Sequence, residues 1–94
     1  MRDRDDVEFE ELFQASFGAV ARTAFLIIGD REVARELTQE AFVQALVHWK
    51  RISRYDNPGG WVRRVAIRLA MRQRSRGSTV APSYDTSASA AYLA

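Results

Sequence analysis

The sequence contains no cysteine, a single histidine (His48) and only two prolines among its 94 residues. Without cysteine the chain has no disulfide bond, no thiolate nucleophile and no thiolate metal ligand. One histidine beside scattered carboxylates does not give the ligand spacing of a metal site, and no glycine-rich phosphate loop occurs. The longest apolar run, residues 24–28, is far too short to cross a membrane, and the acidic N-terminus does not resemble a signal peptide. We therefore expect no metal, no cofactor and no membrane insertion.

Acidic residues at helical spacing, such as Glu32, Glu36 and Glu40, admit two interpretations. Paired carboxylates serve as general acid and base in some enzymes, but this requires an apolar setting that raises one pKa toward neutrality. The sequence around these residues provides no such setting, so a solvated or partner-binding acidic face is the better interpretation. We therefore expect that the protein is not an enzyme.

Charges of opposite sign are concentrated in two different parts of the chain. Residues 1–49 hold ten acidic and five basic residues, whereas residues 50–76 hold nine basic residues and one acid, Asp56. Basic groups attract phosphate, and aromatic residues of the basic part, such as Tyr55 and Trp61, can stack on bases. The formal net charge of +2 hides this contrast, which suggests two faces for two different partners.

Apolar residues recur at steps of three and four along three segments, as they do in amphipathic helices. They are Phe9, Leu12, Phe13, Phe17, Val20, Ala24 and Phe25 in the first segment; Ala34, Leu37, Ala41, Phe42, Ala45 and Trp49 in the second; and Val62, Val65, Ala66 and Leu69 in the third. Gly29 is expected to end the first helix and Asp30 to cap the second, which then runs to about Trp49. Asn57 followed by Pro58 is a typical start for the third helix.

Few strand signals appear, so the predicted fold is all-α, a compact bundle of three to four helices formed by residues 1–76. A chain of 94 residues is one domain at most. Residues 50–56 are expected to form a loop before the last helix. Residues 77–94 are rich in serine and alanine and carry one charge, which predicts a flexible linker or tail.

Arg64, Arg68 and Arg72 are spaced four residues apart, which places them along one side of the last helix. A row of arginines is often only a solvated face. Here no acid lies between Asn57 and Tyr84 to pair with them, and the planar guanidinium group suits phosphates and base edges. We therefore interpret the basic segment as a nucleic-acid-binding surface.

Three segments also carry recognisable motifs. Residues 29–34 read G-D-R-E-V-A, residues 36–42 read E-L-T-Q-E-A-F, and residues 57–66 read N-P-G-G-W-V-R-R-V-A. In order and spacing they resemble the G-D-x-x-x-A, D/E-L-x-Q-E-x-F and N-P-x-x-W-V/L-x-R-V/I-A segments of bacterial RNA polymerase sigma factors, in particular the extracytoplasmic-function (ECF) group. The resemblance covers about residues 9–76 and corresponds to sigma region 2.

The resemblance implies a helical domain that docks on the clamp helices of the largest catalytic subunit of core RNA polymerase, in the cytoplasm. In the family the helix with the Q-E motif makes the main polymerase contact. By position in that motif, the expected polymerase-binding residues are Arg35, Glu36, Gln39, Glu40 and Val43. Exposed acids on this helix would suit a basic helical partner.

The resemblance also implies recognition and melting of the promoter's minus-ten element through capture of a base flipped out of the non-template strand. Extruding a base costs a few kcal/mol, so the protein must repay it with stacking, base-edge hydrogen bonds and phosphate contacts. The expected DNA-binding residues in the loop are Lys50, Arg51, Arg54, Tyr55 and Asp56. Those at the start and along the last helix are Asn57, Trp61, Arg63, Arg64, Arg68 and Arg72.

The chain departs from the family pattern at two basic positions and in its length. Family members often carry asparagine at the position of Arg68 and aspartate at that of Arg72, so this helix is more basic than usual. The second DNA-binding domain of the ECF group is absent, so we expect an excised or truncated domain. Two alternatives stay open, namely a helical module whose partner is an anti-sigma factor and a general nucleic-acid-binding helical protein without base capture.

Overall fold

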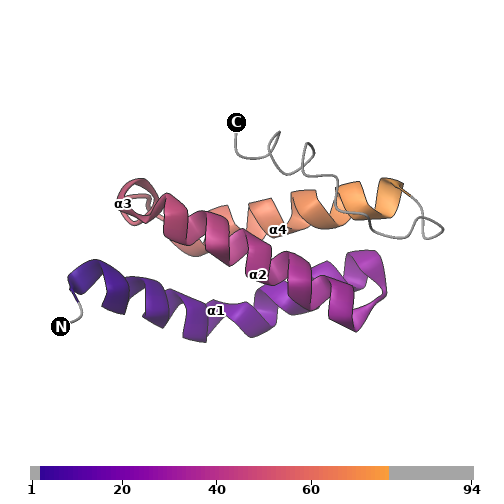
Figure 1. Cartoon of the computed structure of the whole chain (residues 1–94), viewed down its shortest axis with the longest axis horizontal. Helices are drawn as coiled ribbons and strands as arrows, with labels where there is room; N and C mark the ends of the chain where they lie inside the picture. Colours follow the sequence, from indigo (N-terminus) through magenta and orange to yellow (C-terminus); the bar gives the residue numbers. More distant parts are fainter. Residues whose placement is uncertain (1–2, 77–94) are drawn as a thin grey trace.

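The computed structural model describes residues 3–76 and folds them into four helices. In chain order these are α1 (Arg4–Ile28), α2 (Arg31–Val47), α3 (Trp49–Ile52) and α4 (Pro58–Ser75), and no strand occurs within this range. The three long helices pack against one another, with α2 antiparallel to α1 and α4 and with α3 at one end (Figure 1). The predicted all-α bundle is confirmed, while the predicted tail at residues 77–94 lies outside the described part of the chain.

Local capping explains where the three long helices begin and where α1 ends. Each of the three starts at a residue whose side-chain oxygen accepts a backbone N–H of the first turn: Asp3 from Asp6 (2.9 Å), Asp30 from Val33 (3.1 Å) and Asn57 from Gly60 (2.9 Å). α1 ends at Gly29, whose φ of 78° lies in the left-handed region that glycine adopts at little cost. The predicted helix ends at Gly29, Asp30 and Asn57 are therefore confirmed.

The predicted loop at residues 50–56 is wrong in its first part, because residues 49–52 form α3 and α2 ends at Val47 rather than at Trp49. Both Trp49 and Ile52 are buried, with 6% and 0% of their surface exposed. Residues three apart lie on the same face only in a helical turn. Backbone hydrogen bonds from Ile52 to His48 (3.0 Å) and from Ser53 to Trp49 (2.8 Å) close that turn.

Aromatic side chains join α1 to α2. Phe42, 2% exposed, contacts three rings of α1 at centroid distances of 6.3, 5.1 and 5.8 Å, those of Phe9, Phe13 and Phe17. Trp49 meets the ring of Phe9 edge to face at 5.4 Å, a favoured geometry for aromatic pairs. This cluster holds the start of α1 against α3 as well as α2.

Alanine lines much of the remaining core. Buried alanines are found on all three long helices: Ala24, Ala34, Ala41, Ala45, Ala66 and Ala70. Short side chains allow helix axes to approach closely, and the interaxial distance depends on the side chains at the contact. Gly59 extends this pattern, since a Cβ at that position would lie 3.4 Å from the Leu12 side chain of α1.

α1 is the one helix in the described range that is long and apolar enough to cross a membrane by length and composition. Several of its apolar side chains have partners inside the protein. Phe9, Phe13 and Phe17 pack on Phe42, and Val20 is buried. Packing within the bundle thus involves part of the apolar surface of α1, and a single such helix is weak evidence for a membrane span.

Candidate protein and nucleic-acid interfaces

The residues predicted to bind polymerase share one side of α2, here called the α2 face. Arg35, Glu36, Gln39 and Val43 are exposed and Glu40 is half-buried. The opposite side of the same helix holds the buried residues Ala34, Leu37, Ala41 and Ala45. The helical period therefore places the buried residues of α2 in one stripe and the exposed residues in another, the free stripe. This free stripe is acidic toward its start.

Glu40 differs from the solvated acids that the sequence suggests. Partial burial of its carboxyl group raises its pKa above the ordinary value of 4.5, because desolvation disfavours the charged form. Its neighbours on the α2 face, Glu36 and Gln39, are exposed. The Glu40 carboxylate is partly dehydrated before any partner binds, so it has less hydration energy left to lose when a cation pairs with it.

Two apolar residues extend the α2 face and were missed by the sequence-based prediction. Leu46 and Val47 are 51% and 68% exposed, and they follow Val43, itself 57% exposed, at steps of three and four. In the sequence, the spacing of these apolar residues along the otherwise polar side of the predicted helix was the signal that could have revealed them. The α2 face therefore changes from acidic at its start to apolar at its end.

The predicted base-binding segment is exposed and short. Lys50 and Arg51 project from α3, and Arg54, Tyr55 and Asp56 follow it, all exposed at the surface. Only residues 53–57 separate α3 from α4. The segment is fixed at one end by the fully buried Ile52 and at the other by the cap of α4. Its basic and aromatic side chains are thus presented on a short, anchored loop.

The arginines of α4 do not form one surface. Arg64 and Arg68 are exposed and four residues apart on one flank, and Arg72 continues this flank but is half-buried. Arg63 lies on another flank, where it lines a groove between α4 and α1. Trp61 is half-buried and packs against the core. The structure therefore brings Arg64 and Arg68 together and separates Arg63 from them.

The groove beside Arg63 has a volume of about 320 Å³ and is lined by the start of α4 and by small residues of α1. These residues are Ala15, Ser16, Ala19, Val20 and Thr23 of α1, with Asn57, Gly59, Gly60 and Arg63. The side-chain oxygen of Asn57 accepts the cap hydrogen bond from Gly60, while its amide nitrogen can donate to a ligand. Asn57 therefore has a local structural role in addition to the predicted contact with DNA.

The described residues contain no group of three or more histidine, cysteine or acidic side chains that could hold a metal ion. Residues 12–79 match the family of sigma-70 region 2 domains. Comparison with curated proteins and with solved structures gave no match. The matched range spans most of the chain and includes α2, α3 and α4. The chain therefore belongs to the sigma-70 region 2 family, whose domains are not enzymes but bind core RNA polymerase and recognise the promoter minus-ten element.

Proposed function

We propose that this protein is the region 2 domain of a bacterial sigma factor of the ECF group, acting in the cytoplasm. Residues 1–76 form the domain, and residues 77–94 form a linker or tail. The observation that carries the proposal is the separation of two exposed surfaces, the acidic-to-apolar α2 face and the basic surface of α3, its loop and α4. The G-D, Q-E and N-P motifs are the basis for choosing the ECF group.

The α2 face is proposed to dock on the clamp helices of the largest polymerase subunit. Glu36 and Gln39 are exposed where a basic helix can pair with them, and Glu40 lies half-buried beside them. Charge pairs across an interface increase the association rate and orient the partners. Val43 and the residues that follow it on this face supply apolar area, since interfaces commonly have an apolar centre.

The loop after α3 is proposed to capture one unpaired base of the non-template strand. Tyr55, 40% exposed, offers a ring for stacking, and Arg54 and Asp56 offer a base-edge donor and a base-edge acceptor. Lys50 and Arg51 lie beside them on α3, where they can bind the adjoining phosphates. Because the loop is anchored at both ends, little chain entropy is lost when DNA binds.

The exposed flank of α4 is proposed to bind the upstream edge of the melted region. Arg64 and Arg68 face solvent together, and they are four residues apart. At Arg68 the family's frequent asparagine is replaced by a cation, which favours phosphate binding over base-edge reading. Trp61 is half-buried at the start of α4, so one edge of its ring remains for contact with DNA.

Binding to short DNA tests this function. The protein is expected to prefer single-stranded non-template DNA carrying a minus-ten sequence over the duplex and over a scrambled strand, measured by fluorescence anisotropy. Selectivity for the unpaired strand is the thermodynamic source of melting, because binding shifts the equilibrium toward the open form. Equal affinity for the three DNAs, both alone and with core polymerase present, would reduce the proposal to non-specific charge binding.

Pull-down of core polymerase tests the other surface. Charge reversal at two positions, Glu36→Lys and Glu40→Lys, is expected to abolish capture of the polymerase while leaving the affinity for single-stranded DNA unchanged or higher. Retention of the polymerase by this variant would place the interface elsewhere.

An anti-sigma protein is proposed as a second partner. Exposed Val43, Leu46 and Val47 form apolar area on the α2 face, which is typical of a protein contact rather than of a nucleic-acid contact. An anti-sigma factor that covers this face would compete with polymerase. Competition between the two proteins for the α2 face, measured by displacement, would support this regulation.

A further inference from the structure

A groove of about 490 Å³ lies between the start of α1 and the start of α3. Three acids of α1 line it, Asp3, Asp5 and Asp6, and Lys50 and Arg51 of α3 line it as well. The remaining lining residues are Leu46, Val47, His48 and Trp49. Two segments far apart in the sequence and of opposite charge thus share one surface depression.

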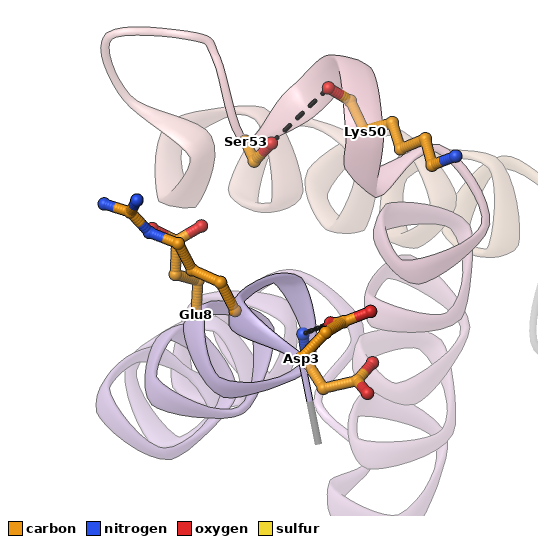
Figure 2. Close-up of polar contacts among 6 residues, drawn as sticks. Asp3, Glu8, Lys50 and Ser53 are labelled. Carbon is orange, nitrogen blue, oxygen red and sulfur yellow. Dashed lines mark hydrogen bonds and ion pairs between the residues drawn. The ribbon is translucent and has the colours of Figure 1, made fainter. Parts of the chain in front are cut away.

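The position of these acids is fixed by the fold. Asp3 caps α1 through its bond to the N–H of Asp6 at 2.9 Å, and the Phe9–Trp49 ring contact holds this end of α1 against α3. In Figure 2 the start of α1 with Asp3 lies below α3 with Lys50, while Glu8 lies on another side of α1. Glu8 pairs there with Arg4 at 3.6 Å, so it is already partly neutralised.

Within the described residues no ion pair at or below 4.0 Å joins the α1 acids to Lys50 or Arg51. Both cations are therefore exposed and ready for phosphate. The acids nevertheless act on any ligand of these cations, because charges interact in water over about 8 Å, the screening length at physiological salt. A DNA phosphate that approaches α3 meets attraction from Lys50 and Arg51 and repulsion from the first turn of α1.

We infer that the acidic first turn of α1 acts on α3 as an electrostatic screen, in the sense that its carboxylates repel DNA phosphates. This repulsion lowers the affinity of the domain for DNA phosphates irrespective of sequence. The inference rests on the proposed DNA-binding role of α3. Binding through α3 then requires additional favourable contacts, such as those of a correctly captured base. Because this penalty is the same for every sequence, it lowers the affinity for a promoter strand and for other DNA alike and leaves their ratio unchanged.

Replacement of two acids by asparagine tests the screen without removing the cap. Asparagine caps helices as well as aspartate does, so Asp3→Asn with Asp6→Asn removes two charges and keeps the helix start. The matched control is Asp30→Asn with Glu32→Gln, which changes a cap residue and a first-turn acid at the start of α2 in the same way. Both variants raise the net charge by the same amount, and circular dichroism checks that both are folded.

The probe is a scrambled single strand of about 15 nucleotides, bound by the full chain at about 50 mM and 300 mM salt. We expect D3N/D6N to bind about threefold more tightly than the unaltered protein at the lower salt, with a smaller gain at the higher salt. The gain in DNA affinity from D30N/E32Q should be clearly smaller than the gain from D3N/D6N. In a background of Lys50→Gln and Arg51→Gln, the gain from D3N/D6N should disappear.

Equal gains from the two charge variants would overturn the screen, because net charge alone would then explain the effect. A gain that persists without Lys50 and Arg51, or no gain at all, would overturn it as well. Failure of the proposed function gives a different result. If the unaltered protein binds minus-ten and scrambled strands equally, base capture fails, while the D3N/D6N comparison on the scrambled strand still decides the screen.

Discussion

The side-chain oxygen of Asn57 accepts a hydrogen bond from the backbone N–H of Gly60 at 2.9 Å, and this bond starts α4. A larger residue at position 60 would require the Asn57 side chain to shift. A Cβ there would lie 2.7 Å from the amide nitrogen of Asn57 and 3.0 Å from its Cγ. A side chain at position 60 is therefore expected to disturb the Asn57 cap that starts α4.

Gly60→Ala tests this dependence. Alanine in place of a helical glycine normally stabilises a helix by about 1 kcal/mol, but here the new methyl group displaces the cap, so the gain should be cancelled. Gly18→Ala on α1 is the control, because nothing lies within 4 Å of a Cβ at that exposed position. We expect G18A to raise the free energy of unfolding by about 0.5–1 kcal/mol and G60A to leave it unchanged or lower. Urea titration measures both, and an equal gain from the two substitutions would contradict the steric argument.

Phe42→Ala should unfold much of the protein. Phe42 is 2% exposed and contacts three aromatic rings of α1, so its removal leaves a cavity between α1 and α2. The expected loss is about 3–5 kcal/mol, a large part of the stability of a small domain. Leu26→Ala, at a position that is 79% exposed, should change stability by less than about 0.5 kcal/mol. Thermal unfolding followed by circular dichroism distinguishes the two, and similar melting temperatures would exclude Phe42 as the centre of the core.

Glu40→Gln should stabilise the domain in a pH-dependent manner. The folded-state pKa of Glu40 is raised above 4.5 by burial, so the folded protein binds the proton more tightly than the unfolded chain does. The contribution of Glu40 to stability is therefore greatest below pH 4.5 and is lost as the pH rises through the raised pKa. The gain from E40Q should be larger at pH 7 than at pH 4, as measured by urea titration at the two values. A gain that is equal at both pH values would show that burial does not act on the carboxyl charge.

Arg64→Ala and Arg68→Ala should each weaken DNA binding through the loss of a phosphate contact. A lost contact lowers the slope of log affinity against log salt by about 0.7 for a single strand and about 0.9 for duplex DNA. Arg22→Ala, an exposed arginine on α1, serves as the control and should leave the slope unchanged. Weaker binding with an unchanged slope at Arg64 or Arg68 would instead assign that residue to a base edge.

Leu46→Glu and Val47→Glu should weaken capture of core polymerase without unfolding the domain. Both side chains are more than half exposed on the α2 face, so a charge there is tolerated in the free protein but is desolvated in an apolar contact. Leu26→Glu is the control, since Leu26 is exposed on α1, outside the α2 face. Pull-down of polymerase should fall about tenfold or more for the first two variants, as for loss of a central interface residue. Equal capture by all three variants would confine the interface to the acidic part of α2.

Most of the fold follows from periodicity in the sequence. The stripes that contain Phe42 and Val62 are buried as expected, and the helix ends at Gly29 and Asn57 are where capping rules place them. α3 was not predicted, because a single turn is too short to show a periodic pattern. Ile52 of α3 is buried by helices that are distant in the sequence, and a local sequence pattern cannot predict such contacts.

The candidate surfaces were predictable in part. The motifs and charges indicate the exposed residues of α2, the loop and α4. The raised pKa of Glu40 and the division between Arg63 and Arg64 depend on neighbouring helices, so they required the folded structure. The same holds for the groove that Asp3 and Lys50 both line, since Asp3 precedes α1 and Lys50 lies on α3, far apart in the sequence.

The alanine-lined core gives the domain a mechanical property. The α2 face and the arginine flank of α4 are carried by two helices that pack against each other, and both contribute buried alanines to the core, among them Ala41 and Ala66. Close-packed interiors deform little, so displacement of one surface is transmitted to the other. The close packing of the core is therefore expected to keep the α2 face and the arginine flank of α4 at a fixed separation, whichever partner binds first.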